Sequence, residues 1–380
     1  MHLFDVYPLY DIEPVRARDV YFWDNRGAQY LDFYGGHAVI SIGHSHPHYV
    51  QKLTEQLNRI GFYSNSVQIP LQQELASKLG ALSGYDDYHL FLCNSGAEAN
   101  ENALKLASFH SRRKVIVAFG HSFHGRTSAA VAATDNPKIR APLNQVHETI
   151  FLPLNDEEDL LKVFQRRDIC AVIIEGIQGI GGIHVPESWF LERIQSLCQQ
   201  SGALLILDEV QSGYGRTGKF FAHQYALVRP DLITIAKGMG NGFPVAGVLI
   251  HPKFKASHGL LGTTFGGNHL ACAAAVAVLE IIAQENLVDH SGDLGAYLLE
   301  QLRQMTRGIR EIRGRGLMIG IELEFASQEI RNKLLFEHKI FTGSAHEAST
   351  IRLLPPLTLA RQHADRFLEC FAAVMKHHHE

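Results

Sequence analysis

The feature of this 380-residue sequence that most restricts its fold is a pair of short apolar runs, each of which ends in a charged residue. Residues 204–207 (LLIL) lead into Asp208 and Glu209, and residues 232–236 (LITIA) lead into Lys237. Runs of this length are typical of buried strands in a parallel sheet. Open α/β sheets bind ligands beyond the carboxyl ends of their strands. We therefore expect Asp208 and Lys237 in one crevice, either as an ion pair or with an amine that does covalent chemistry.

A purely structural role for these charges is the alternative interpretation, because charged residues often cap buried strands. Gln211, three residues after Asp208, adds a polar side chain to the same region. Glycine allows the backbone to approach a ligand or to take a positive φ. The glycines that flank the two sites are Gly213, Gly215, Gly218, Gly238, Gly240 and Gly242. These neighbours favour a ligand site over simple capping.

A second stretch upstream predicts an anion site. Residues 88–93 (YHLFLC) predict a strand, and NSGAEANENALKLASFH predicts a helix with Ser95 and Gly96 at its start. Free N–H groups and the helix dipole favour phosphate at such a helix start. An ordinary N-cap at Ser95 explains the pattern equally well, so the residues alone leave both interpretations open.

Composition excludes several classes of protein. Hydrophobic residues make up 46% and charged residues 19% of the chain, which favours a sizeable folded core over disorder. The net charge of −4 gives no electrostatic reason to expect a nucleic-acid partner. The five cysteines form no CxxC motif, which fits a reducing cytoplasm without zinc ribbons or a disulfide framework. No signal peptide and no apolar run long enough for a membrane span are expected.

The segments LLILDEVQSGYGRTGKFFAHQ and PDLITIAKGMGNGFPVAG resemble the core of the class III pyridoxal-phosphate aminotransferases, the ornithine/acetylornithine type. The resemblance covers nearly the whole chain, with several long motifs in the expected order. It implies that Lys237 forms the Schiff base with the cofactor aldehyde. It also implies that Asp208 lies against the pyridinium nitrogen, so that the ring acts as an electron sink. By the same resemblance, Gln211 forms a hydrogen bond with the ring hydroxyl and Val210 packs on one face of the ring.

The resemblance assigns further cofactor contacts to Ser95, Gly96, Ala97, Phe123, Glu175 and Thr264. Ser95, Gly96 and Ala97 are expected to hold the phosphate. Phe123 is expected to stack on the ring, a contact worth on the order of 1 kcal/mol beyond burial. Thr264, in GTTFGGNHL, is expected to reach the phosphate in the partner subunit, which implies an obligate homodimer with active sites at the interface.

Four further residues are expected to bind substrate. Arg126, in GHSFHGRT, and Arg352, in IRLLPPL, match the two arginines of the family, and a guanidinium suits bidentate binding of a carboxylate. Tyr7 falls where relatives have a substrate-contacting tyrosine, and His37 falls at a specificity position. Loop-packing roles explain Tyr7 and His37 equally well.

Two residues depart from the family pattern in the segment GIQGIGG after the predicted strand 170–175. Gly176 replaces a usual proline. Ile180 replaces a glutamate that pairs with the distal arginine and gates between the two substrates. Either another acid takes over this pairing or Arg352 stays open to carboxylate in both half-reactions. The segment is not a dinucleotide-binding turn, because the pattern ends at His184 where glycine is required.

The histidines of GHSHPHYV are expected to have turn or capping roles rather than to bind metal, because no cysteine or carboxylate lies beside them in the sequence. No metal site is expected. The helix after them begins at Pro47 and is expected to end near residue 60. An alanine-rich helix is expected over 269–284, and further helices over about 287–305, 327–338 and 361–376, with strands near 309–323.

These patterns predict an α/β protein of PLP-dependent transferase fold type I. A large domain with a doubly wound, mostly parallel sheet is expected over residues 46–267. A small α+β domain is expected from residues 268–380, with residues 1–45 contributing to it.

The predicted function is transamination in two half-reactions, with Lys237 as the general base and acid. The opening DVYPL and YGGHAVISIGHSHP point to an N-acylornithine, acetylated or succinylated, as donor of its δ-amino group to 2-oxoglutarate in arginine biosynthesis. Ornithine, 4-aminobutyrate or another ω-amine is the alternative donor. A nicotinamide oxidoreductase is a second hypothesis, which the incomplete GxGxxG pattern disfavours. A PLP-binding protein without activity is a third, which the complete set of Asp208, Gln211, Lys237 and Arg126 disfavours.

Overall fold

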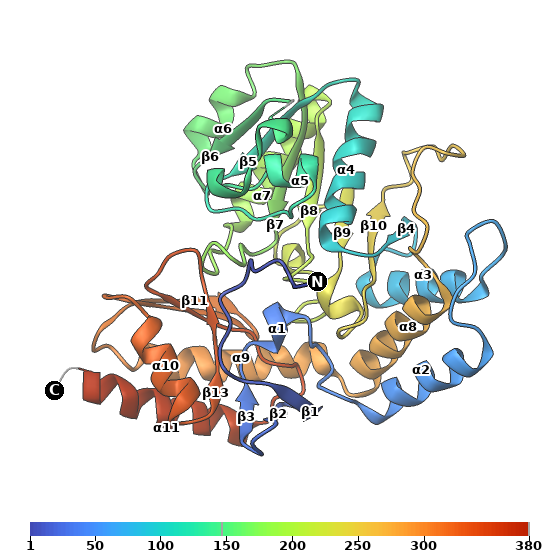
Figure 1. Ribbon diagram of the computed structural model, residues 1–380. Helices are drawn as coiled ribbons and strands as arrows, with labels where there is room; N and C mark the ends of the chain where they lie inside the picture. The colour runs from blue at the N-terminus through green and yellow to red at the C-terminus, as the bar shows by residue number, and fades with distance from the viewer. Residues whose placement is uncertain (146, 379–380) are drawn as a thin grey trace.

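The computed structural model describes residues 1–145 and 147–378, and its largest sheet has seven strands in the order β4-β10-β9-β8-β7-β5-β6 (Figure 1). Strand β10 runs antiparallel to its neighbours β4 and β9, and the other neighbouring pairs are parallel. The strands are β4 (His89–Cys93), β5 (Val115–Phe119), β6 (Thr149–Leu152), β7 (Ile169–Glu175), β8 (Leu204–Asp208), β9 (Leu232–Ile235) and β10 (Ala246–Ile250). The mostly parallel sheet predicted from the apolar runs is therefore confirmed.

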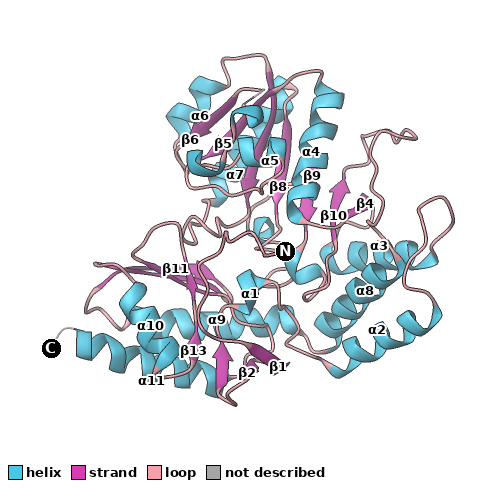
Figure 2. Cartoon of the chain, in the orientation of Figure 1, coloured by secondary structure: helices cyan, strands magenta, loops and turns pink. Residues whose placement is uncertain are grey.

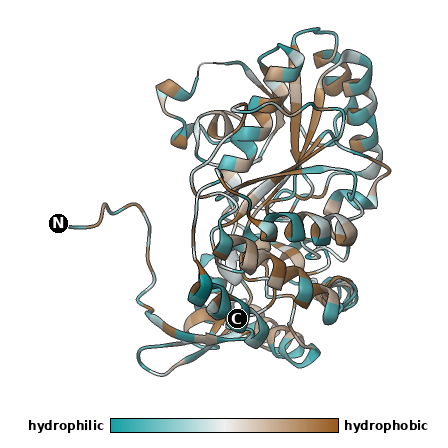
Figure 3. Cartoon of the chain, turned by 90° about the vertical axis from the view of Figure 1, so that its right-hand side faces the viewer, coloured by the Kyte–Doolittle hydropathy of each residue, from teal (hydrophilic) through white to brown (hydrophobic). Residues whose placement is uncertain are grey.

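Helices cover both faces of this sheet, as a doubly wound fold requires (Figure 2). Alternate residues of β8 point to opposite faces. Leu204 and Ile206 pack in the cluster that contains α4 (Gly96–Ser111), whereas Leu205 and Leu207 pack in the cluster that contains α7 (Ser188–Ser201). Further helices of this part are α3 (Pro70–Ser83), α5 (Ser128–Ala132), α6 (Glu157–Val163) and α8 (His269–Gln284). Apolar residues concentrate on the strands between these layers (Figure 3).

A smaller antiparallel sheet, in the order β11-β12-β15-β14, forms a second unit together with three helices. This is the α+β arrangement predicted for the C-terminal part. The strands are β11 (Ile309–Arg315), β12 (Met318–Leu323), β14 (Gly343–Ser344) and β15 (Thr350–Leu353), and the helices are α9 (Leu287–Arg303), α10 (Gln328–Phe336) and α11 (Arg361–His378).

A third sheet joins the two ends of the chain, because β3 pairs in parallel with β13. Its strands are β1 (Pro14–Arg18), β2 (Tyr21–Asp24), β3 (Gln29–Asp32) and β13 (Ile340–Phe341), and the short α1 (Gly35–Ala38) follows. Helix α2 (Pro47–Arg59), which begins at the predicted proline, packs against α8. The domain boundaries at residues 45/46 and 267/268 stay a prediction.

The three alternating histidines of the GHSHPHYV loop bind three different carboxylates. His44 Nε2 lies 2.9 Å from Asp32, His46 Nε2 lies 2.8 Å from Glu285, and a third pair joins the ring of His48 to Glu280. Each imidazole thus has a separate partner that the sequence did not reveal. No group of three or more His, Cys, Asp or Glu side chains in the described part of the chain is arranged to hold a metal ion.

No single helix in the described ranges is both long enough and apolar enough to cross a bilayer. Helices α8 and α9 taken together are long and apolar enough for a membrane span, but they are bent by 63° relative to each other.

Candidate active site

A cavity of about 380 Å³ opens beyond the carboxyl ends of the central strands. Strand register places Glu175 at the end of β7 opposite Asp208 at the end of β8, and Asp208 opposite Thr234 of β9, three residues before Lys237. The structure therefore brings the two charged strand ends into one crevice. Ten predicted site residues line the cavity: Ser95, Gly96, Ala97, Phe123, Arg126, Glu175, Asp208, Val210, Gln211 and Lys237.

Lys237, which lines this cavity, is held in an unfavourable backbone conformation. Its φ of 45° lies in the left-handed region, which costs a residue with a side chain on the order of 1–2 kcal/mol. Burial lowers the pKa of the Lys237 amine below its usual value, and the positive charge of Arg352 adds to this effect, while Asp208 and Glu175 oppose it. A neutral amine is the form that attacks a carbonyl or accepts a proton.

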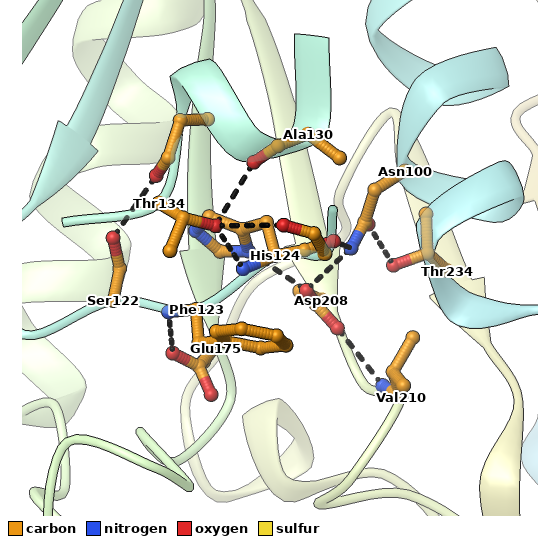
Figure 4. Close-up of polar contacts among 12 residues, drawn as sticks. Asn100, Ser122, Phe123, His124, Ala130, Thr134, Glu175, Asp208, Val210 and Thr234 are labelled. Atoms are coloured by element: carbon orange, nitrogen blue, oxygen red, sulfur yellow. Dashed lines mark hydrogen bonds and ion pairs between the residues drawn. The ribbon is translucent and has the colours of Figure 1, made fainter. Parts of the chain in front are cut away.

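Asp208 is buried and its carboxylate is fixed by donors from three segments (Figure 4). Oδ2 lies 2.7 Å from His124 Nδ1 and accepts a hydrogen bond of 2.7 Å from Asn100 Nδ2. Oδ1 accepts the backbone N–H of Val210 at 3.0 Å. These bonds hold the carboxylate in one orientation at the cavity wall.

Glu175, beside Asp208, holds the loop that carries Phe123 by a hydrogen bond to its backbone. Its Oε1 accepts the backbone N–H of Phe123 at 3.0 Å and its Oε2 accepts that of Gly179 at 2.8 Å. Burial raises the pKa of Glu175 to about 7, with a further increase from Asp208, against the lowering effect of His124 and the two backbone bonds. The structure thus gives Glu175 a role in positioning the loop.

The start of α4 forms the wall where a phosphate is predicted. The first N–H groups of a helix have no partner within the helix and favour an anion. Ser95 is a true N-cap as well, since its hydroxyl accepts the N–H of Glu98 at 3.2 Å. A Cβ added at Gly96 would lie only 2.7 Å from Val210 Cγ1, so glycine is needed for the close approach of the two segments. Both sequence interpretations, cap and anion site, are compatible with this geometry.

Gln211, which lines the cavity, contacts Arg352, which does not line it. The amide of Gln211 donates to the carbonyl of His37 at 2.9 Å, and its Oε1 lies 3.4 Å from Arg352 Nη1. Arg352, in β15, is 2% exposed and also donates from Nε to the carbonyl of Ser344 at 2.5 Å. Burial lowers the pKa of the Arg352 guanidinium to about 10. No ion pair joins Arg352 to a carboxylate among the described residues.

Arg126 and the remaining substrate candidates lie in different surroundings. Arg126 lines the cavity and is exposed, with no ion pair to a described carboxylate. The His37 ring lies against the Tyr34 hydroxyl, and the pKa of His37 is lowered to about 4 by desolvation and by the charges of Arg352 and Lys237. Tyr7 is 73% exposed, on an N-terminal arm that extends from the body of the molecule (Figure 3), and does not line the cavity.

Thr264 does not line the cavity of its own chain and is exposed. It lies beside Phe265, whose ring contacts Phe62 at 5.5 Å between centroids. The structure therefore places Thr264 on an outer surface, apart from the residues with which sequence reasoning grouped it.

Sequence reasoning missed His124 and Asn100, which both line the cavity and bond Asp208. A signal for each was present. His124 lies between Phe123 and Arg126 in GHSFHGRT, and Asn100 lies four residues after Gly96, on the same helical face. The sequence did not indicate which carboxylate His124 and Asn100 bind.

The fold and the cavity, with a buried lysine and a fixed aspartate beyond parallel strands, define the class of PLP-dependent enzymes of fold type I. The aminotransferase class-III family model matches residues 6–375. The chain belongs to this family, and it is a pyridoxal-phosphate-dependent aminotransferase.

Relatives and solved structures agree with this assignment. Acetylornithine aminotransferase of Bacillus subtilis is 40% identical over 99% of this chain and 98% of its own length. Acetylornithine aminotransferase of Archaeoglobus fulgidus is 38% identical over 97% of this chain and 96% of its own. The crystal structure of ornithine aminotransferase from Toxoplasma gondii superimposes with a TM-score of 0.90 at 28% identity, covering 97% of this chain and 92% of that one. An (S)-enantioselective ω-transaminase from Thermomicrobium roseum has a TM-score of 0.88 at 29% identity, with 99% and 96% covered.

Proposed function

We propose that this enzyme transfers the δ-amino group of an N-acylornithine to 2-oxoglutarate, giving N-acylglutamate semialdehyde and glutamate in arginine biosynthesis. The observation that carries the proposal is the near full-length identity of 36–40% to relatives named acetylornithine aminotransferase. The solved ornithine aminotransferases are more distant, at 28–29%.

The cavity chemistry favours an acylated donor over free ornithine. Free ornithine carries a second ammonium at its α-carbon, which needs a negative partner. The only carboxylates that line the described cavity are Glu175 and Asp208, which are buried and hydrogen-bonded. Acylation removes this charge and leaves an α-carboxylate for Arg126. A 4-aminobutyrate donor also lacks a second ammonium, so only a comparison of rates separates it from an N-acylornithine.

The residues of the cavity fit pyridoxal phosphate. Ser95, Gly96 and Ala97 at the start of α4 are proposed to bind its phosphate, with Phe123 and Val210 on the two ring faces. Asp208 is proposed to bind the ring nitrogen and Gln211 the ring hydroxyl. The bound cofactor supplies an aldehyde that bonds an amine and a ring that takes up an electron pair. Glu175 is proposed to hold the Phe123 loop in place.

Lys237 is the proposed catalytic residue. Its Nζ would bond the cofactor aldehyde and, when free, would act as the base and acid that moves a proton between substrate and cofactor. Burial favours the neutral amine that this role requires. Arg352 is proposed to bind a carboxylate of glutamate or 2-oxoglutarate. Since Ile180 offers no charge, Arg352 is proposed to stay open in both half-reactions. Tyr7 and His37 are also proposed substrate contacts.

A cytoplasmic homodimer is part of the proposal. Phe265 (61% exposed), next to Thr264, contacts Phe62 (43%). Asn65 of the same segment bonds the backbone at Gly266, and this segment also carries the exposed Tyr63 (54%) and Val67 (50%). Apolar surface of this kind is typical of an interface with a second subunit, from which Thr264 would reach the partner's phosphate site. The five cysteines are all unpaired, which supports a reducing compartment.

The test is a comparison of kcat/KM for N-acetylornithine, N-succinylornithine, ornithine and 4-aminobutyrate with 2-oxoglutarate as acceptor. The proposal expects one of the two acylated donors to exceed the others by at least about tenfold, the effect of about 1.4 kcal/mol. A clear preference for ornithine or 4-aminobutyrate would replace it with the alternative ω-amine function. Conversion of none of the four amines, with cofactor bound, would reject the proposed donor.

A further inference from the structure

The chain around Arg126 is held to α4 by a single side chain, that of Glu101. Glu101 Oε2 accepts a hydrogen bond of 2.6 Å from the Thr127 hydroxyl, and Thr127 directly follows Arg126. The same oxygen accepts the backbone N–H groups of Ala129 and Ala130 at 2.9 and 3.2 Å. Oε1 also accepts the N–H of Ala129, at 3.1 Å. Glu101 thus joins α4 to the start of α5, which packs beside it (Figure 1).

These bonds supply the cap that α5 does not provide for itself. The first N–H groups of a helix have no partner within the helix. Thr127 is the N-cap residue of α5, yet its side chain accepts no N–H of that helix. A helix of five residues makes few internal hydrogen bonds, so it depends on contacts from outside. The position of Glu101 therefore sets where α5 begins and how the chain leaves Arg126.

The residue before Arg126 is fixed against α4 as well. Gly125 has a φ of 132°, and a Cβ added there would lie only 2.7 Å from the Cβ of Ala97. The Arg126 side chain, by contrast, is exposed at the cavity and forms no ion pair with a carboxylate in the described ranges. The place of its guanidinium therefore depends on the backbone on either side of it.

We propose that Glu101 is a positioning residue for Arg126, and that it thereby sets how tightly the enzyme binds the carboxylate of its amino donor. The inference rests on the proposed contact between Arg126 and that carboxylate. A bidentate contact between a guanidinium and a carboxylate requires both groups in one orientation, so a small displacement of the loop weakens it. Glu101 does not line the cavity, and it acts on the donor through the loop.

Asp156 provides a matched control, because it is a carboxylate that caps another helix of the same large sheet. Its Oδ1 accepts the N–H of Asp159 at 3.0 Å at the start of α6, and it does not line the cavity. Loss of either cap should lower stability. Only the loss of Glu101 should change the binding of the donor.

The experiment uses the cofactor-loaded, full-length enzyme in a double-mutant cycle. The variants are Glu101→Leu, Glu101→Gln, Arg126→Leu, Asp156→Ala and the double variant Glu101→Leu/Arg126→Leu. Leu removes both acceptors, whereas Gln keeps one oxygen, which can take the place of Oε2 and receive three of the four bonds. Single-turnover kinetics with N-acetylornithine give the saturating rate and the apparent Kd of the donor. The melting temperature reports stability.

We expect Glu101→Leu to raise the apparent Kd of the donor by about tenfold and to change the saturating rate by less than about twofold, since binding of the carboxylate is lost equally before and during the reaction. Glu101→Gln should stay within about threefold of the wild type, because most of the bonds remain. In the Arg126→Leu background, Glu101→Leu should change the Kd by less than about twofold, because no guanidinium is left to misplace. Asp156→Ala should lower only the melting temperature.

An unchanged Kd in Glu101→Leu would overturn the inference. A rise of equal size in the Arg126→Leu background would also overturn it, since Glu101 would then act by another route. If Glu101→Leu does not fold, Thr127→Val, which removes the hydroxyl bonded to Glu101, takes its place in the cycle.

Failure of the proposed function has a different signature. A normal donor Kd in Arg126→Leu would reject the proposed carboxylate contact, and the inference with it. If the wild type converts ornithine or 4-aminobutyrate but not N-acetylornithine, the proposed donor is rejected. The same cycle with the converted amine, which also carries a carboxylate, then decides the role of Glu101.

Discussion

At the scale of single residues, the site depends on groups that are costly to bury and are tolerated because their partners are fixed. Lys237 combines a left-handed backbone with a buried amine. Asp208 has three hydrogen-bond donors. Strain and burial of this kind persist where the surrounding structure enforces them, and they are typical of functional sites.

The lowered pKa of Lys237 predicts its reactivity as a function of pH. Only the neutral amine reacts with acylating reagents, and burial favours that form, so the half-maximal rate of labelling should occur at a lower pH than the ordinary lysine value of 10.5. Labelling of the apoprotein with an anhydride over a pH series, followed by peptide mass spectrometry, measures this. The exposed Lys255 is the internal control, and an equal midpoint for both lysines would contradict the prediction.

About half of the residues that line the cavity could be predicted from the sequence. Asp208 and Lys237 follow apolar runs and Ser95 precedes a predicted helix, whereas most of the other residues follow from the resemblance to the family. The partners of Asp208 could not be predicted in the same way. His124 is 84 residues from Asp208 and Asn100 is 108 residues away, and only the folded chain shows which carboxylate each side chain meets.

At the scale of elements, short continuous apolar runs predicted the central strands, but the contacts between the large and the smaller unit had no signal in the sequence. Arg216, in the loop after β8, is fully buried among backbone carbonyls. It donates from Nη1 to the carbonyls of Leu317 and Pro355, at 3.1 and 2.8 Å. Burial lowers the pKa of Arg216 to about 10. The Arg216 side chain thus joins the loop after β8 of the large sheet to the smaller unit by hydrogen bonds.

Replacement of Arg216 by methionine should therefore reduce stability. The change keeps most of the volume but leaves two buried carbonyls without a donor, each costing about 1–3 kcal/mol. We expect the free energy of unfolding to fall by about 2–4 kcal/mol, measured by urea denaturation of the apoprotein. The exposed Arg303→Met is the control. A loss below about 0.5 kcal/mol at Arg216 would show that the carbonyls find other partners.

At the scale of the whole molecule, the proposed homodimer explains why Thr264 and the apolar cluster around it are exposed in one chain. Phe265→Asp should place a charge in the interface and shift the protein toward monomer in sedimentation velocity. It should also weaken cofactor binding if Thr264 contributes to the partner's site. Leu227→Asp, at an equally apolar position that is 90% exposed, is the control. An unchanged dimer in Phe265→Asp, or a wild-type monomer with full affinity for the cofactor, would reject this interface.

The most direct test of the central claim is a half-reaction without acceptor. The cofactor-loaded enzyme is mixed with N-acetylornithine or N-succinylornithine, and the semialdehyde formed per active site is counted. We predict a single equivalent of semialdehyde from at least one of them, release of glutamate only after 2-oxoglutarate is added, and no product from Lys237→Ala. No semialdehyde from either acylated donor, or a faster burst from ornithine or 4-aminobutyrate, would contradict the assignment of this enzyme to N-acylornithine.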